Sequence, residues 1–357
     1  MASILADQEE NRKLLRVRYR SAVSKLLDAL KTDPRADFSE GQLENLGIQL
    51  QTFDPGDVEF LESHACLFKL VPEKALEEFS LDEPTARKGL YETDQEFNET
   101  WEVDWTWNKT PPSETYSMRM RAYQIFIRLK SFCQHLGRKD GRDWNTFNYI
   151  YGWNHVTAES SFIDGGEGLF SCWGMRHQEW SVETCNEWQD DCDDMDTIAP
   201  HILLVTCTGT TAKDGELLFG ELGPIVQALR NRLDQKEFEK TSLFPVLVVS
   251  LFGPRHGRLL QARFSKSGIL KIRASPIYSF LTAAEGPWNL FLRFFACDPK
   301  DGTEYEFYSE DEDAEAAPAV SPKYVAPSPK FDQENLPLKS VDEDSSSGPR
   351  DPFSKLS

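Results

Sequence analysis

The segment from residue 200 to residue 299 constrains the fold most strongly, because apolar runs alternate in it with short polar turns. Two apolar runs, at 200–208 and 216–222, precede an amphipathic helical pattern at 223–238, and at least three further strands follow. Strands that precede and follow a single helix in this order predict a mixed β-sheet with one central helix. The sequence therefore predicts an α+β (mixed α/β) fold.

Composition divides the chain into three regions. Residues 1–197 are helical in pattern and rich in aromatic residues, residues 198–300 form the mixed sheet core, and residues 301–357 form an acidic tail. Residues 201–300 contain 13 Lys and Arg against 8 Asp and Glu, whereas the tail contains 5 against 14. Few apolar residues and many charges predict a disordered tail. The net charge of −20 repels nucleic acid from the whole chain, although the basic core could tolerate it.

Two long helices are expected in the first region, at residues 6–31 and 113–137. In the first of them, apolar residues recur at steps of three and four and so form one stripe. The stripe consists of Leu15, Tyr19, Ala22, Leu26 and Leu30, and the opposite face carries Arg12, Arg16, Arg20 and Lys25. Such a helix either packs against the core through its apolar stripe or docks a partner.

The first two apolar runs of the core allow two topologies. The polar residues between 208 and 216 favour an antiparallel hairpin of 200–208 with 216–222, and the helix then begins at Pro224. In the alternative, 216–222 joins the helix, and 200–208 and 244–253 become parallel neighbours of one βαβ unit. The loop at 208–215 is then a candidate for cradling phosphate, although it lacks the glycine spacing of the common phosphate motifs. We expect the hairpin.

The segments 257–264 and 269–275 predict a second hairpin, with an apolar and a polar face. Between residues 253 and 273 there are six basic residues and no acidic one. Such a hairpin favours binding of phosphates, RNA or an acidic partner; otherwise its polar face is solvated or docks the chain's own tail. The candidate anion-binding residues are Arg255, His256, Arg258, Gln261, Arg263, Lys271 and Arg273.

About 100 of the 357 residues resemble a restriction-endonuclease-like, or PD-(D/E)xK, core in degenerate form. In that family a Pro-Asp begins one strand and a Glu-x-Lys ends the next, and a helix, a buried strand and often a hairpin follow. The acids bind a divalent metal and the lysine positions or activates the attacking water. Here Pro200-His201 stands in place of Pro-Asp, and Glu221-Leu222-Gly223 in place of Glu-x-Lys. Gln227 falls where the family often has a polar residue that faces the site.

The resemblance implies that Glu221 and His201 are the catalytic residues if the chain is an active nuclease. A lone carboxylate is a poor magnesium site, because magnesium prefers several oxygen ligands in octahedral array. We assign no metal ligand and no cofactor, and a divalent metal enters only under the nuclease interpretation. The chain as a whole also resembles proteins of filamentous fungi that have no assigned activity.

Seven cysteines without a CxxC pair indicate buried thiols, and the first residues contain no signal-peptide pattern. We therefore expect an intracellular protein, cytoplasmic or nuclear, that does not bind a membrane. The function expected is a non-catalytic interaction protein on a degenerate nuclease-like core, which binds an anionic protein or nucleic acid through the basic hairpin. The alternative is a divergent metal-dependent nuclease that acts through Glu221.

Overall fold

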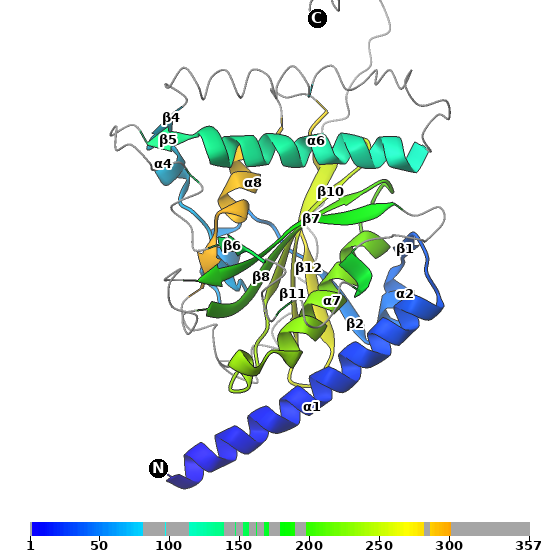
Figure 1. Ribbon diagram of the computed structural model, residues 1–357, viewed down its shortest axis with the longest axis vertical. Helices are drawn as coiled ribbons and strands as arrows, with labels where there is room; N and C mark the ends of the chain where they lie inside the picture. Colours follow the sequence, from blue (N-terminus) through cyan, green and yellow to red (C-terminus); the bar gives the residue numbers. More distant parts are fainter. Residues whose placement is uncertain are drawn as a thin grey trace, which may run out of the picture. The chain divides into compact units, whose positions relative to one another are not determined.

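A mixed sheet of eight strands forms the centre of the larger of two compact units, Met1–Glu315, in this computed structural model (Figure 1). The structure describes residues 2–80, 114–138, 153–156, 168–170, 179–189, 198–281 and 286–300, together with Phe97, Phe147 and Phe162. The aromatic residues at 101–107 and the acidic tail at 301–357 lie outside the described residues. Helices and a mixed sheet together confirm the α+β class.

The sheet order is β2-β12-β11-β10-β8-β7-β6, and β13 pairs with β11 beside this path. The strands are β2 (Ile48–Thr52), β6 (Trp153–His155), β7 (Trp180–Gln189), β8 (Ile198–Thr208), β10 (Val246–Phe252), β11 (His256–Phe264), β12 (Leu270–Ala274) and β13 (Tyr278–Ser279). Pairs of two-residue strands lie outside the sheet: β1 (Asp37–Phe38) with β9 (Leu217–Leu218), β3 (Phe68–Lys69) with β14 (Asp298–Pro299), and β4 (Phe79–Ser80) with β5 (Gly137–Arg138).

Strands β8 and β10 are parallel neighbours, joined by the helix α7 (Phe219–Asp234). Ile202 pairs with Val246 and Thr208 with Phe252 in this register. The expected hairpin of 200–208 with 216–222 is therefore wrong, and the alternative βαβ unit is confirmed. Residues 219–222 form the first turn of α7, and the short strand β9 pairs with β1 instead. The helix begins one turn before Pro224, not at it.

The boundary expected at residue 197 falls between two neighbouring strands of one sheet. Strand β7 precedes it, β8 follows it, and the two pair antiparallel along most of their length. Strands β2 and β6 also come from the first region and complete the two ends of the sheet. Regions 1–197 and 198–300 thus share one sheet and do not form separate domains.

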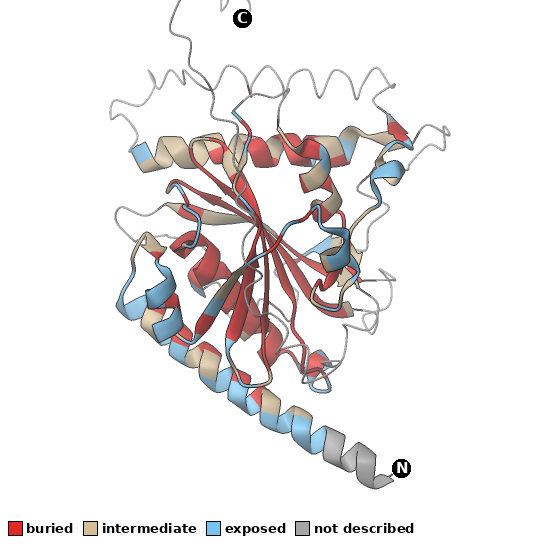
Figure 2. Ribbon diagram, turned by 180° about the vertical axis from the view of Figure 1, so that it is seen from behind, coloured by how far each residue is buried: buried red, intermediate tan, exposed pale blue. Residues whose placement is uncertain are grey.

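Helices cover both faces of the sheet. On one face lie α7 and α1 (Ala2–Thr32) (Figure 1). Their apolar side chains share a core cluster with Ile202, Leu204, Val246 and Val248. On the other, α6 (Glu114–His135) and α8 (Trp288–Phe295) pack over the intervening side chains of the same strands. Figure 2 shows the central strands and α7 as the most continuously buried elements, whereas α1 exposes its outer side. The sheet is therefore the middle of three layers.

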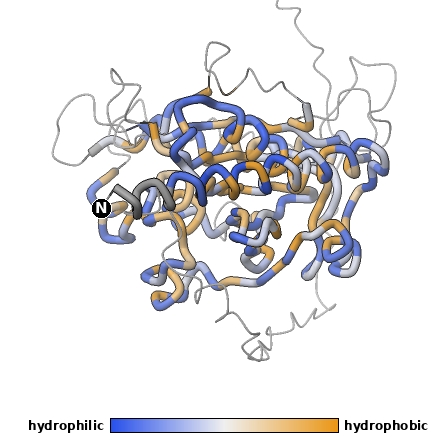
Figure 3. The backbone as a smooth tube through the Cα atoms, turned by 90° about the horizontal axis from the view of Figure 1, so that it is seen from below, coloured by the Kyte–Doolittle hydropathy of each residue, from blue (hydrophilic) through white to orange (hydrophobic). Residues whose placement is uncertain are grey.

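The long helices expected at 6–31 and 113–137 are α1 and α6. Tyr19, Leu26 and Leu30 of the expected apolar stripe are buried against the core, as the spacing of three and four requires. Figure 3 shows how hydrophilic and hydrophobic residues alternate along α1, the helix that follows the N-terminus. The remaining helices of the described residues are short: α2 (Glu40–Asn45), α3 (Val58–Glu62), α4 (Glu73–Leu76), and the 3-10 helices η4 (Gly168–Phe170) and η6 (Lys236–Phe238).

Candidate functional site

Glu221 lies in the first turn of α7 and is fully buried. Its Oε1 accepts hydrogen bonds from Ser250 Oγ at 2.7 Å and from Arg258 Nε at 2.8 Å. Its Oε2 accepts from the backbone N–H of Leu218 at 2.8 Å and from Arg258 Nη2 at 2.5 Å. The Arg258 guanidinium thus binds the carboxylate through two hydrogen bonds, and this bidentate geometry is the strongest for such a pair.

These contacts give Glu221 a structural role. The bond to the Leu218 N–H satisfies one of the donors that the start of a helix leaves unpaired, and a negative charge is favoured there. Each carboxylate oxygen already accepts two hydrogen bonds, so a metal ion would have to displace Arg258 or Ser250. Among the described residues, no group of three or more His, Cys, Asp or Glu side chains could hold a metal ion.

A row of polar side chains crosses the sheet beneath Glu221. Thr206 of β8, Ser250 of β10 and Arg258 of β11 are register partners and share the face that α7 covers. The hydroxyls of Thr206 and Thr208 are buried and have no hydrogen-bond partner within the described part of the chain. Sequence reasoning missed Ser250, although it is the one polar residue in the apolar run of β10. It assigned Arg258 to anion binding without identifying Glu221 as its anion.

His201 does not meet Glu221. It lies near the start of β8, and its ring packs edge-on against Phe68 at 5.3 Å between centroids, on the face covered by α6 and α8. Glu221 contacts the other face, beside Thr206, five residues further along the strand, or roughly 16 Å. Burial lowers the pKa of His201 to about 3, so the ring is neutral near pH 7. The two candidate catalytic residues therefore form no common site.

The basic hairpin is present, but its polar face is covered. Alternation places Leu260 and Ala262 toward α7, as expected, and sends Gln261, Arg263, Lys271 and Arg273 to the other face. All four of these polar side chains are at least nine-tenths buried. Gln261 accepts from the Leu67 N–H at 3.3 Å, and Arg273 donates to the Ala65 carbonyl at 3.0 Å. The prediction that the polar face of this hairpin is open to an anionic partner is therefore wrong, because the segment before β3 covers that face.

The turn between β10 and β11 directs Arg255 inward. Its side chain is fully buried, donates to the Phe97 carbonyl and lies over the Phe97 ring at 3.9 Å from the centroid. Its φ of 125° is in the region that favours glycine, so the backbone is strained there. His256 is half-buried, and desolvation lowers its pKa. Of the two arginines of the expected cationic turn, Arg255 is thus buried in the core and Arg258 binds Glu221.

Gln227 of α7 is also an internal residue. Its Nε2 donates to Asn231 Oδ1 at 2.8 Å, and its Oε1 accepts from the backbone N–H of Leu169 at 3.2 Å. The side chain is buried and holds η4 against α7. It therefore does not face Glu221, which lies six residues, or about 1.7 turns, earlier in the helix.

The loop at 208–215 occupies the position of a phosphate-binding loop, between a parallel strand and the start of a helix. Its first half is already engaged: the Gly209 N–H donates to the Glu179 carbonyl at 2.8 Å, and Thr211 Oγ1 donates to the Gly253 carbonyl at 3.1 Å. A Cβ at Gly209 would lie 2.0 Å from the Thr115 carbonyl oxygen, so α6 packs closely on this loop. The Glu221 carboxylate fills the anion position at the start of α7.

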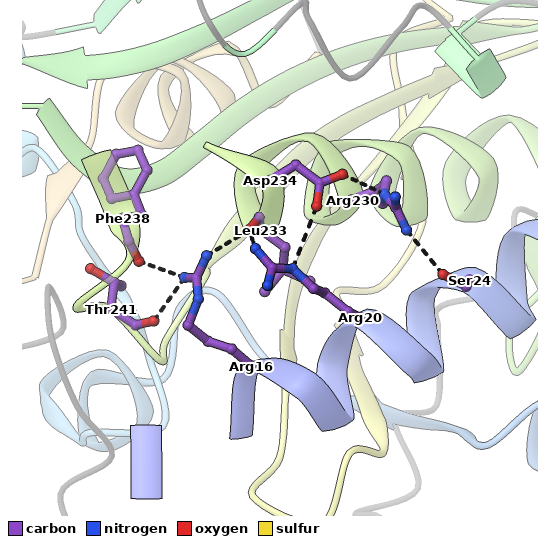
Figure 4. Close-up of polar contacts among 8 residues, drawn as sticks. All are labelled: Arg16, Arg20, Ser24, Arg230, Leu233, Asp234, Phe238 and Thr241. Atoms are coloured by element: carbon purple, nitrogen blue, oxygen red, sulfur yellow. Dashed lines mark hydrogen bonds and ion pairs between the residues drawn. The ribbon is translucent and has the colours of Figure 1, made fainter. Parts of the chain in front are cut away.

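Helix α1 is attached to the opposite end of α7 by arginines (Figure 4). Arg16 donates to the carbonyls of Leu233, Phe238 and Thr241, and Arg20 donates to Leu233 at 2.9 Å. Arg230 Nε donates to Asp234 at 2.6 Å and its Nη1 to Ser24 Oγ at 2.9 Å. Desolvation lowers the pKa of Arg16 to about 10, which leaves it charged near pH 7. Arginines suit this place, because the last carbonyls of a helix lack partners and carry partial negative charge.

In the described part of the chain, none of the helices combines the length and the apolar character that crossing a bilayer needs. Comparisons with protein-family models, curated proteins and solved structures returned no match to this chain.

Proposed function

We propose that this chain is a non-catalytic interaction protein built on an endonuclease-like core. The observation that carries the proposal is the saturated, fully buried Glu221 carboxylate, which Arg258 neutralises and Ser250 and Leu218 also bind. A nuclease acid has to leave oxygens available for a metal ion and to face the substrate. Glu221 does neither, because its oxygens serve the packing of α7 on the sheet.

The order of elements supports the endonuclease-like part of the proposal. Two antiparallel strands, β7 and β8, precede α7; a buried strand, β10, parallel to β8, follows it, and the hairpin of β10 with β11 comes next. The family expected from the sequence has this order, but the two strands before the helix are β7 and β8, so Glu221 lies outside both. The end of β8 carries Thr206-Cys207-Thr208 in place of an acid and a lysine.

The state of the cysteines supports an intracellular location. Five cysteines are described, Cys66, Cys133, Cys185, Cys207 and Cys297, and each is a buried free thiol. Burial raises the pKa of the Cys185 thiol to about 12, which keeps it protonated and unreactive. Proteins of oxidising compartments use cysteines mainly as disulfides, so buried free thiols favour a reducing compartment.

The test is a cleavage assay with the purified full-length chain. Labelled single- and double-stranded DNA and RNA are incubated with magnesium or manganese, beside Glu221→Gln and the matched control Glu216→Gln, which alters a carboxylate of the neighbouring loop. We expect no cleavage above background by any of the three proteins. Metal-dependent cleavage by the wild type and by Glu216→Gln, absent in a Glu221→Gln protein that retains its circular dichroism spectrum, would overturn the proposal and establish the nuclease alternative.

A further inference from the structure

Helix α1 exposes a continuous stripe along its outer side. While Arg16, Arg20 and Ser24 hold the inner side on α7, a row of exposed residues spaced by about one turn runs along the outer side. The stripe consists of Glu10, Leu14, Val17, Ser21, Lys25 and Asp28, spaced by four, three, four, four and three residues. At 1.5 Å per residue it is roughly 27 Å long, enough to contact a partner helix of about 18 residues.

The middle of the stripe is apolar. Leu14 and Val17 are 56% and 64% exposed, and they are one turn apart on the same side of the helix. Few large apolar side chains of the described residues are as exposed; Val58, at 61%, is comparable. Arg18, next to Val17, donates to the Lys266 carbonyl in the β11–β12 turn and so joins the stripe to the sheet. The apolar pair is thus presented on a helix fixed at two places.

The stripe is bordered by positive charge. From residue 11 to residue 27 the helix contains six basic residues and no acidic one, in a chain whose net charge is −20. Of these six, Lys13, Arg18, Arg20 and Lys25 are exposed, while Arg16 is buried against α7. Lys13 also pairs with Glu9 at 2.8 Å and Arg20 with Asp234 at 3.5 Å, and both ion pairs are solvent-exposed or partly so. Exposed leucine and valine between lysines and arginines complement a segment that carries its own apolar residues between acids.

We propose that the outer face of α1, formed by Lys13, Leu14, Val17, Arg18, Ser21 and Lys25, docks an acidic amphipathic segment of another protein. This proposal rests on the proposed function and names the docking surface and the kind of partner. A short segment fits best, because charges are screened beyond about 8 Å at physiological salt, so only the local cations act on it. A long nucleic acid would extend onto the acidic remainder of the chain.

Other occupants fit the surface less well. In an antiparallel pair of α1 helices centred on Leu14 and Val17, Lys13 of one copy would lie opposite Arg18 of the other, and a parallel pair also places like charges together. Two exposed apolar side chains, with Glu10 and Asp28 at the ends of the stripe, give little to bury in a lipid surface. The acidic protein segment satisfies both the apolar pair and the cations.

Fluorescence anisotropy tests the proposal with the metal-free full-length chain. The probe is a fluorescein-labelled peptide of three Glu-Leu-Glu-Ala-Leu-Glu-Ala heptads, beside a version with serine for leucine. We expect saturable binding of the leucine peptide, weakened about tenfold in Leu14→Gln/Val17→Gln and in Lys13→Gln/Lys25→Gln. The matched control, Val58→Gln/Lys74→Gln, makes the same exchanges at exposed residues of α3 and α4 and should bind like the wild type.

Several outcomes overturn the proposal. They are no saturable binding up to about 1 mM peptide, equal affinity of wild type and Leu14→Gln/Val17→Gln, or binding of the serine peptide as tightly as the leucine peptide. Tighter binding of a single-stranded oligonucleotide or of phosphatidylserine vesicles also overturns it, as does a dimer lost in Leu14→Gln/Val17→Gln. None of these readouts involves cleavage, so failure here leaves the non-catalytic assignment to be decided by the nuclease assay alone.

Discussion

The Glu221–Arg258 pair shows how one buried interaction can explain residues that looked functional. Each charge is removed from water, which is costly, and the loss is offset only because every contact of the carboxylate is a hydrogen bond of good length. Arg258 also donates to the Glu216 carbonyl at 2.8 Å, so the same guanidinium fixes the loop that leads into α7. The pair links β11, the loop and α7 at one point.

Removing one member of this pair should destabilise the protein strongly. Glu221→Gln leaves the Arg258 charge buried without its anion, and we expect a loss of about 3–5 kcal/mol in the free energy of unfolding, measured with urea. The double variant Glu221→Gln/Arg258→Met should lose less than the sum of the two single variants, because neither charge is then left alone. Glu216→Gln, which alters the partly exposed Lys213–Glu216 pair, should change stability by less than about 1 kcal/mol. Additive losses in the cycle would contradict the pairing.

Among the elements, α1 depends on contacts that no local pattern could reveal. Its apolar stripe was readable from spacing, but Arg16 was expected on the outer face and instead lies buried at the end of α7. A long arginine can extend from the border of an apolar stripe to carbonyls on a neighbouring helix. Which carbonyls it meets depends on how α7 ends, which lies more than two hundred residues further along the chain.

Arg16→Met tests this attachment. Methionine keeps the apolar contact but leaves the carbonyls of Leu233, Phe238 and Thr241 without this donor, and we expect a loss of about 1–3 kcal/mol in urea unfolding. Hydrogen exchange should also become faster in α1 than in β10, because α1 is the element released. Lys25→Met, on the exposed side of the same helix, is the control and should change neither measurement. Unchanged exchange in Arg16→Met would show that the apolar stripe alone holds the helix.

Local patterns predicted several elements correctly and failed where an apolar run was ambiguous. The alternation in β11 and β12 assigned both faces of the hairpin, since a strand has a period of two. The run of Leu217, Leu218, Phe219 and Leu222 has no decisive period and so predicts one strand. In the structure only Leu217 and Leu218 form a strand, and the first turn of α7 begins at Phe219. The polar face of the hairpin is predicted to be exposed, because the local sequence around Gln261 and Arg273 carries no sign that a distant segment covers them. That segment includes Ala65 and Leu67.

At the scale of the whole molecule, the sheet is assembled from both halves of the chain. Strand β2 pairs parallel with β12, more than two hundred residues later, and β7 pairs with β8 across the boundary that composition suggested. The change from an acidic to a basic composition near residue 197 therefore does not mark the end of a core. Pairings between distant segments determine this arrangement, and composition does not report them.

A fragment of residues 198–300 should therefore not fold alone. It would lose β7, which covers one edge of β8, and β2, which covers the edge of β12, and it would expose the face that α6 packs on. Unpaired edges and an uncovered apolar face disfavour an ordered state, because the polar groups and apolar side chains released have no other partner. Thermal melting followed by circular dichroism should show no cooperative transition for 198–300. The fragment 1–315, which spans the larger compact unit, should melt cooperatively. A cooperative melt of 198–300 would contradict this prediction. It would show that residues 198–300 form an independent domain and that β8 is stable without β7.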